Sequence, residues 1–120
     1  MKTAVILLGH GSQAECGNDA LAEVAAMVRE RGGLDVSHAY LQFCRPDLAQ
    51  AVDEAAAHGA RKIIVLPYFL YLGNHVSRDI PDELGRLKEK HPGVEFVLAE
   101  HLGAHPKLAE IVFERIKKHY

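Results

Sequence analysis

The stretch from residue 4 to residue 12 reads Ala4-Val5-Ile6-Leu7-Leu8-Gly9-His10-Gly11-Ser12. Its first five residues are apolar, and the β-branched side chains of Val5 and Ile6 favour an extended strand. An unbroken apolar run of this length is typical of a strand that is covered on both faces, as in a parallel sheet. Three further apolar runs have the same character, at residues 36–41, 63–66 and 94–98. The sequence therefore predicts four strands.

Helical patterns follow the four runs. In three of them, apolar residues recur at the spacing of one helix face. These residues are Leu21, Val24, Ala25 and Val28 in the first pattern, Leu48, Ala51, Val52 and Ala55 in the second, and Leu108, Ile111, Val112 and Ile116 in the last. A shorter pattern of Ile80, Leu84 and Leu87 predicts the third helix. We expect Pro46, Pro81 and Pro106 to stand in first helical turns, where proline is tolerated.

Strands and helices thus alternate four times with short connections. This order predicts an α/β three-layer sandwich, in which helices cover both faces of a mainly parallel four-stranded sheet with a flavodoxin-like layout. No linker or low-complexity stretch divides the chain, so we expect one domain over residues 1–120.

Composition excludes several classes of protein. Hydrophobic residues make up 48% of the chain and charged residues 25%, as in an ordinary folded domain. The net charge is -2 and the basic residues are dispersed, which disfavours a nucleic-acid partner. The apolar run at residues 4–8 is too short for a signal peptide or a membrane span, so we expect a cytoplasmic protein without membrane contact. Cys16 and Cys44 form no Cys-x-x-Cys pair, and we expect two unpaired thiols.

Candidate site residues follow the strands. In open α/β sheets, ligands bind beyond the carboxyl ends of the strands, which here selects residues 9–13, 42–46 and 67–78. Glycines flank His10 and allow a ligand to approach the backbone, so we expect His10 to face an open cavity. The alternative is that His10 packs at a tight turn. His75 follows Gly73-Asn74 and is expected on a flexible turn.

Two neutral imidazoles converging from two strand ends suit cobalt, nickel, iron or zinc. A pair of protein ligands leaves coordination positions open, which favours a metal ion that is handed on over a structural ion. An imidazole also acts as a base near neutral pH, and His10 is the candidate base.

Residues 67–81 are apolar for an exposed loop. A flat apolar macrocycle would cover the aromatic side chains there, and the alternative is a loop folded onto the core or onto a dimer partner. Arg45 and Arg78 are placed to bind carboxylates of such a ligand, although lone charges of this kind are often only solvated. Glu100 and His101 end the fourth strand, and we consider them for a supporting role at the metal site.

The Gly9-His10-Gly11-Ser12 turn, combined with the loop from Phe69-Leu70 to Gly73-Asn74-His75, resembles a known family. This family is the small single-domain class II chelatases that act on sirohydrochlorin, the cobaltochelatases and ferrochelatases of cobalamin, sirohaem and nickel-tetrapyrrole biosynthesis. The resemblance covers essentially the whole chain. It implies a chelatase-like fold and a lyase that inserts Co2+, Fe2+ or Ni2+ into sirohydrochlorin, with the metal as substrate and no organic cofactor.

The resemblance also implies roles for individual residues. His10 and His75 would bind the metal ion, and His10 would also accept a proton. Seven residues would line the tetrapyrrole site: Arg45, Leu70, Tyr71, Leu72, Gly73, Asn74 and His75. A homodimer is implied as well, because larger relatives place two such domains around one cleft. Relatives often carry glutamate where this chain has Gln42, whose neutral amide cannot accept a proton.

Two rival functions use the same residues. A histidine-phosphatase-like phosphotransfer enzyme also opens with a His-Gly turn after its first strand, but it needs an arginine where this chain has Gly9. A metal or tetrapyrrole carrier would use both histidines without turnover. The sequence does not choose the physiological metal, since imidazoles follow the general affinity order of divalent ions.

Overall fold

The computed structural model describes residues 2–14, 16 and 20–120. In chain order, its elements are β1 (Thr3–Gly9), α1 (Leu21–Gly32), β2 (Asp35–Tyr40), α2 (Leu48–Ala57), β3 (Lys62–Pro67), α3 (Asn74–Lys90), β4 (Glu95–Leu98) and α4 (Pro106–Lys117). The four strands form one parallel sheet in the order β2-β1-β3-β4. The predicted alternation, the parallel sheet and the α/β class are confirmed.

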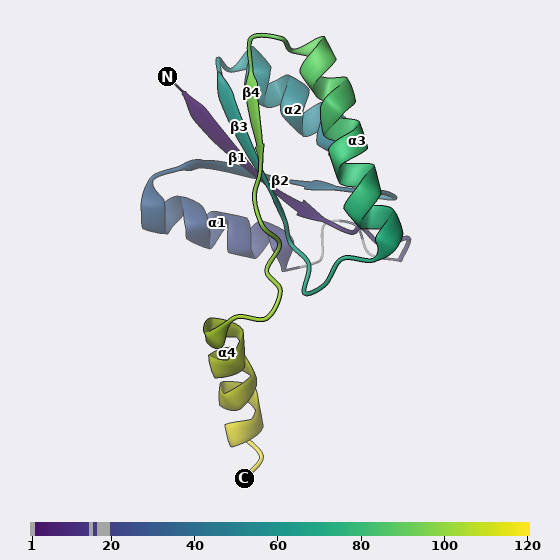
Figure 1. The fold of residues 1–120 in the computed structure, drawn as a ribbon. Coiled ribbons are helices and arrows are strands. Elements are labelled where there is room, and N and C mark those ends of the chain that lie inside the picture. The colour runs from purple at the N-terminus through teal and green to yellow at the C-terminus, as the bar shows by residue number, and fades with distance from the viewer. Residues whose placement is uncertain (1, 15, 17–19) are drawn as a thin grey trace.

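Helices pack on both faces of the sheet, in which β1 is one of the two inner strands. Figure 1 shows α1 on one side of the sheet and α2 with α3 on the other. Ile6 and Leu8 of β1 lie fully buried in the core under α2 and α3, whereas Leu7 joins a smaller core with α1. Burial on both faces explains why residues 4–8 form an unbroken apolar run.

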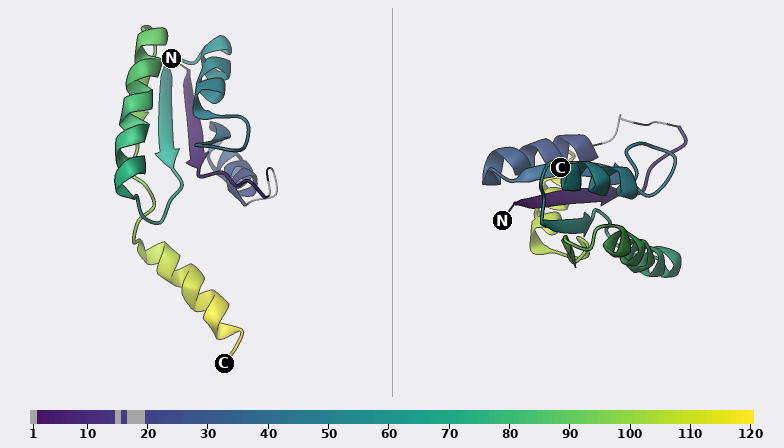
Figure 2. Two further views of the ribbon diagram at one scale, coloured as in Figure 1. Left: turned by 90° about the vertical axis from the view of Figure 1, so that its right-hand side faces the viewer. Right: turned by 90° about the horizontal axis from the view of Figure 1, so that it is seen from above.

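Helix α4 extends away from the rest of the chain, beyond the carboxyl edge of the sheet (Figures 1 and 2). Its predicted apolar stripe is present, but none of its residues is buried. The longest dimension of the molecule is accordingly 54 Å, against 32 and 26 Å in the other two directions. The face of the sheet that carries α1 is therefore covered by this one helix, whereas α2 and α3 together cover the opposite face.

The start of α3 differs from the prediction. The helix begins at Asn74, and Pro81 lies inside it rather than in its first turn. Interior proline removes one backbone hydrogen bond and costs about 3 kcal/mol. The packing of Ile80, Leu84 and Leu87 in the core offsets this loss, and Val76 continues the same apolar series one turn earlier.

The expectation of two unpaired thiols is wrong. Cys16 and Cys44 form a disulfide between the segments that follow β1 and β2. Backbone hydrogen bonds already hold these segments side by side, from Leu41 N to Gly9 O at 2.9 Å and from Gln42 N to His10 O at 3.3 Å. Residues distant in the sequence are thereby brought together, which the spacing of two cysteines does not reveal.

None of the helices within the described residues has the length and apolar character needed to cross a lipid bilayer.

A polar contact joins α2 to the C-terminal end of α3. Lys90 Nζ donates to Asp53 Oδ2 at 2.9 Å, and His91 Nε2 lies 2.8 Å from Asp53 Oδ1. The hydrogen bonds from Lys90 and His91 lower the pKa of Asp53 from its ordinary value of 3.8. The contact helps to hold α3, and with it His75, against the body of the protein.

We expect Asp53→Asn to lower the free energy of unfolding near neutral pH by at most about 1 kcal/mol, because the contact is largely exposed to solvent. A lowered carboxyl pKa adds stability above the ordinary pKa, and this stability is lost as the pH falls through the folded-state value. Urea unfolding of both proteins at about pH 7 and about pH 3 measures the difference. A difference of the same size at both pH values would contradict this origin.

Candidate active site

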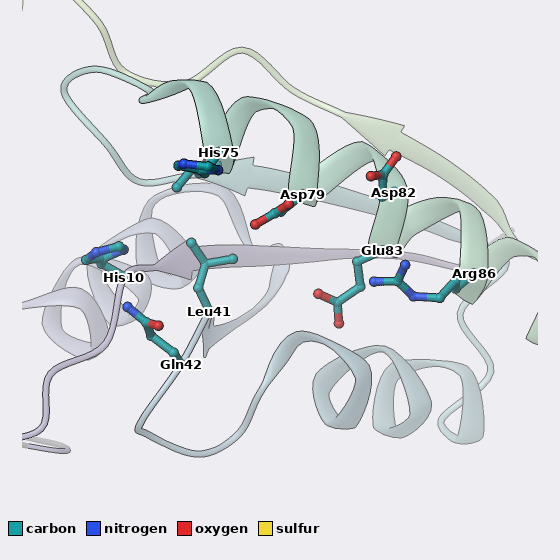
Figure 3. A pocket seen from close by; sticks show the side chains of 9 residues that line it. His10, Leu41, Gln42, His75, Asp79, Asp82, Glu83 and Arg86 are labelled. Atoms are coloured by element: carbon teal, nitrogen blue, oxygen red, sulfur yellow. The ribbon is translucent and has the colours of Figure 1, made fainter.

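A cavity of about 430 Å³ lies at the carboxyl edge of the sheet, between the ends of β1 and β2 and one side of α3 (Figure 3). Its walls are formed by His10, Leu41, Gln42, His75, Val76, Asp79, Asp82, Glu83 and Arg86. The volume falls within the range of small-molecule sites. The cavity thus lies beyond the carboxyl ends of the strands, where the sequence predicted a ligand site.

Two glycines place His10 at the rim of this cavity. Gly9 is buried at the end of β1, and a Cβ there would lie 2.7 Å from Leu21 Cδ2. Gly11 has a φ of +93°, and a Cβ at this position would overlap the carbonyl oxygen of Gln42. The chain therefore turns sharply after β1, and the side chain of His10 is exposed.

The ring of His10 packs against Phe69 from the segment after β3. The two ring centroids are 5.9 Å apart and the planes are almost perpendicular, at 82°. Such an edge-to-face contact restricts the orientation of the imidazole. Our sequence interpretation placed Phe69 in the apolar loop but did not connect it with His10.

His75 is the second residue of α3 and its side chain is exposed. The prediction that a flexible turn carries His75 is therefore wrong, because the helix begins directly after Gly73. Figure 3 shows His75 and His10 at the same end of the cavity, one on the helix and one at the end of β1. The structure thus brings together the two histidines that were predicted as a pair.

An acidic helix face lines the rest of the cavity and was missed at the sequence level. Asp79, Asp82, Glu83 and Arg86 follow His75 at intervals of four, seven, eight and eleven residues, which place them on one side of a helix. This helical spacing is visible in the sequence. It was missed because the helix was predicted to begin near Pro81, which left His75 and Asp79 outside it.

Glu83 is the carboxyl group most affected by the cavity. Partial burial raises the pKa of Glu83, and the nearby negative charge of Asp47 raises it further, while the positive charge of Arg86 opposes both. Glu83 consequently holds a proton more readily than a surface glutamate. In Figure 3, Glu83 and Arg86 lie at the end of the cavity away from the histidines.

The two histidines are the strongest metal-binding groups of the cavity. Among the described residues, no cluster of three or more histidine, cysteine, aspartate or glutamate side chains is arranged to hold a metal ion. A pair of imidazoles suits a metal ion that is bound transiently, because the remaining coordination positions stay free for another ligand.

The remaining predicted binding residues lie outside this cavity. Arg45 is exposed on the segment between β2 and α2. Leu70 and Tyr71 are 60% and 82% exposed. Gly73 caps α3 and Asn74 is its first residue. Leu72 lines a neighbouring pocket between α3 and the end of β4, together with Glu100 and His101. Their contact with a tetrapyrrole stays a prediction.

Gln42, which follows β2, lies at the candidate site. Its side chain lines the cavity, and its backbone N–H donates to the carbonyl oxygen of His10. A proton acceptor at this position would lie beside the candidate metal ligand. The amide cannot serve as one, whereas Asp79 and Glu83 in the same cavity can.

Fold and cavity together define an α/β protein with a pair of imidazoles at the carboxyl edge of a parallel sheet. Comparison with known families identifies it further, because the CbiX family model matches residues 4–119. The chain belongs to the CbiX family.

Relatives and solved structures support this membership. A sirohydrochlorin cobaltochelatase from Methanopyrus kandleri is 36% identical, and the alignment covers 96% of this chain and 95% of that protein. A CbiX structure from Marinobacter aquaeolei has 29% identity and a TM-score of 0.76, with coverage of 98% and 96%. Bacillus subtilis SirB, solved with Fe3+, has 25% identity and a TM-score of 0.82; 98% of this chain matches 47% of that one.

Proposed function

We propose that this chain is a chelatase that inserts a divalent transition-metal ion into sirohydrochlorin. The observation that carries the proposal is that His10 and His75 line one open cavity at the carboxyl edge of the sheet. Membership in the CbiX family and the sirohydrochlorin cobaltochelatase activity named for relatives support the same reaction. Co2+, Fe2+ or Ni2+ would be the metal substrate, and no organic cofactor is needed.

The histidine pair would hold the incoming ion loosely. Imidazole nitrogens bind borderline metal ions well, and two of them leave room for the ring nitrogens to coordinate the ion before the protein releases it. Phe69 restricts the ring of His10, so part of this geometry exists before the metal arrives.

Metal insertion releases two protons from pyrrole nitrogens, and each needs an acceptor. His10 can take a proton once its metal has moved to the ring. Asp79 and Glu83 line the same cavity and can relay protons toward solvent, and the raised pKa of Glu83 favours proton uptake there. In this scheme the carboxylates of α3 supply the function that Gln42 cannot.

The tetrapyrrole would lie over the rim of the cavity. We assign contact with its flat face to the exposed apolar side chains of Leu70 and Tyr71, with the backbone of residues 72–74 beside them. Arg45 would pair with the carboxylates of the substrate. The cavity of one chain is small for a complete macrocycle, which favours a homodimer in which two chains enclose the substrate.

The proposal treats residues 1–120 as a single chelatase domain that acts in the cytoplasm without nucleic-acid or membrane partners. The histidine-phosphatase alternative receives no support, because the buried Gly9 has no room for the arginine that such a site requires. A carrier of metal or tetrapyrrole differs from a chelatase in turnover alone.

Anaerobic incubation with sirohydrochlorin tests the proposal. Co2+, Ni2+ and Fe2+ are added separately at catalytic concentrations of protein, and the visible absorption is followed against a reaction without protein. We expect at least one metal ion to be inserted many times per chain. Conversion that stops at one ring per chain would indicate a carrier, and conversion at the spontaneous rate with all three metals would contradict the proposal.

A further inference from the structure

The Cys16–Cys44 disulfide lies beside the candidate site and takes no part in the proposed reaction. Cys44 follows two residues after Gln42, whose side chain lines the cavity. On the other segment, Ser12 follows two residues after His10, and its carbonyl oxygen lies 3.5 Å from Cys16 Sγ and 3.3 Å from Cys44 Sγ. The disulfide therefore packs directly on the turn that presents His10.

Consecutive residues of this turn contact the segment that follows β2. The carbonyl oxygen of Gly9 accepts a hydrogen bond from Leu41 N at 2.9 Å. The carbonyl oxygen of His10 accepts one from Gln42 N at 3.3 Å. Gly11 leaves no room for a Cβ against the carbonyl oxygen of Gln42. The position of His10 therefore depends on how firmly the segment after β2 is held.

Phe43, between Gln42 and Cys44, has an unfavourable backbone conformation. Its φ is +68°, a value that residues with bulky side chains rarely adopt. The backbone N–H of Cys44 donates to the carbonyl oxygen of Gln42 at 2.8 Å, which closes the chain tightly around Phe43. Such a conformation persists only where the surrounding contacts enforce it. The covalent bond to Cys44 is one of these contacts, so its opening favours relaxation of the turn.

The two sulfur-bearing residues differ in accessibility. Cys16 is exposed, whereas Cys44 is only 5% exposed and packs in the smaller core with α1. Disulfides are reduced by attack of a thiolate on one of the two sulfur atoms, and accessible disulfides are the ones that react in folded proteins. A thiolate from solvent can reach Cys16 Sγ, which makes Cys16 the point of attack.

We propose that the Cys16–Cys44 disulfide is a redox site that controls metal binding by His10 and His75, and that its reaction partner is a dithiol. A thiolate of the partner attacks Cys16 Sγ, the S–S bond breaks, and Cys44 leaves as a thiolate that takes up a proton. The second thiolate of the partner then displaces Cys16 from the mixed disulfide, and Cys16 takes up a proton. The protein gains two electrons and two protons, and the dithiol becomes a disulfide.

The oxidised chain holds the turn of His10 in place opposite His75 and binds the metal ion. The reduced chain keeps the backbone hydrogen bonds of Gly9 and His10 and stays folded, but its turn moves more freely and binds the ion more weakly. Disulfides in the cytoplasm are characteristically transient and redox-sensing. The inference rests on the proposed function for its biological role, which is to slow metal insertion when the disulfide is reduced.

Calorimetry with Co2+ alone tests this control in the full-length chain. One sample is oxidised in air; another is reduced anaerobically with dithiothreitol, which gel filtration then removes. Thiol titration counts the free cysteines of each sample, and circular dichroism verifies folding. Cys16→Ser/Cys44→Ser represents the open form without thiolates that could bind the ion. The same variant with and without dithiothreitol treatment is the matched control for the reductant.

We expect no free thiol in the oxidised chain and two in the reduced chain, which holds two cysteines in all. The dissociation constant for Co2+ should rise by about 10-fold or more on reduction and in the serine variant, as when a group that supports a metal ligand is lost. Oxidised glutathione should restore the original value in wild type. Treatment with dithiothreitol should leave the serine variant unchanged.

NMR spectra of the histidine rings without metal provide a second readout. The signal of His10, assigned by its loss in His10→Ala, should shift on reduction, whereas the signal of the exposed His119 should not. A cross-link that only adds stability would leave both signals in place.

Three results would overturn the redox control: cysteines that stay free in air, a disulfide that dithiothreitol reduces only after unfolding, and Co2+ binding that is equal or tighter in the reduced chain. Absence of Co2+ binding in every sample would overturn it together with the assignment of the two histidines. A chain that binds Co2+ with the expected dependence on the disulfide, but never metallates sirohydrochlorin, would contradict the proposed function alone.

Discussion

Replacing His75 or His10 by alanine is expected to reduce cobalt insertion into sirohydrochlorin by about 100-fold or more. The two imidazoles are the only histidine side chains among the described residues that line the cavity, and loss of one leaves the ion with a single imidazole nitrogen. Changes to groups that merely support a metal ligand already lower affinity or activity by about 10- to 100-fold. Removing the ligand itself should have at least this effect.

The matched control is His119→Ala, since this exposed histidine lies after the end of α4 and does not line the cavity. It should retain the wild-type rate. Cobalt binding without tetrapyrrole, followed by calorimetry, separates loss of the metal from damage to later steps. Circular dichroism should show that the exposed positions of His10 and His75 tolerate alanine. Full activity in the double variant His10→Ala/His75→Ala would refute the assignment.

The sequence pattern predicted the sheet well because burial constrains strands on two faces. Residues 4–8 have no exposed side in the centre of the sheet, and such a run has few alternatives to a buried parallel strand. The pairing of His10 with His75 followed from the same rule, since the carboxyl ends of parallel strands share one edge. Both predictions depended on order along the chain rather than on atomic detail.

What the sequence did not reveal depended on tertiary packing. Pro81 is a strong local signal for a helix start, but core contacts of Ile80 and Leu84 override it, and the true start at Asn74 carries His75 and the acidic face. The apolar stripe of α4 was predicted correctly, but the spacing of apolar residues does not show which surface the stripe will cover. The disulfide between Cys16 and Cys44 likewise depends on two loops lying side by side.

Substituting alanine for Gly11 is expected to lower both stability and activity. The φ of +93° is unfavourable for a residue with a side chain, and the added Cβ would overlap the carbonyl oxygen of Gln42. Strain of this kind costs about 1 to 3 kcal/mol at one residue. A loss of about 2 kcal/mol would lower the melting temperature by roughly 8 °C in a domain of this size.

Activity should fall as well, because the overlap separates the segments after β1 and β2 and displaces His10 from its position opposite His75. Gly59→Ala is the matched control, since Gly59 has nearly the same φ of +94° but open space around its Cβ. It should lose about 1 kcal/mol through backbone strain and keep the wild-type rate of metal insertion. Thermal unfolding and the cobalt-insertion assay on both variants separate strain from overlap. Equal losses of stability with unchanged activity in Gly11→Ala would show that the close approach of Gly11 to Gln42 does not position His10.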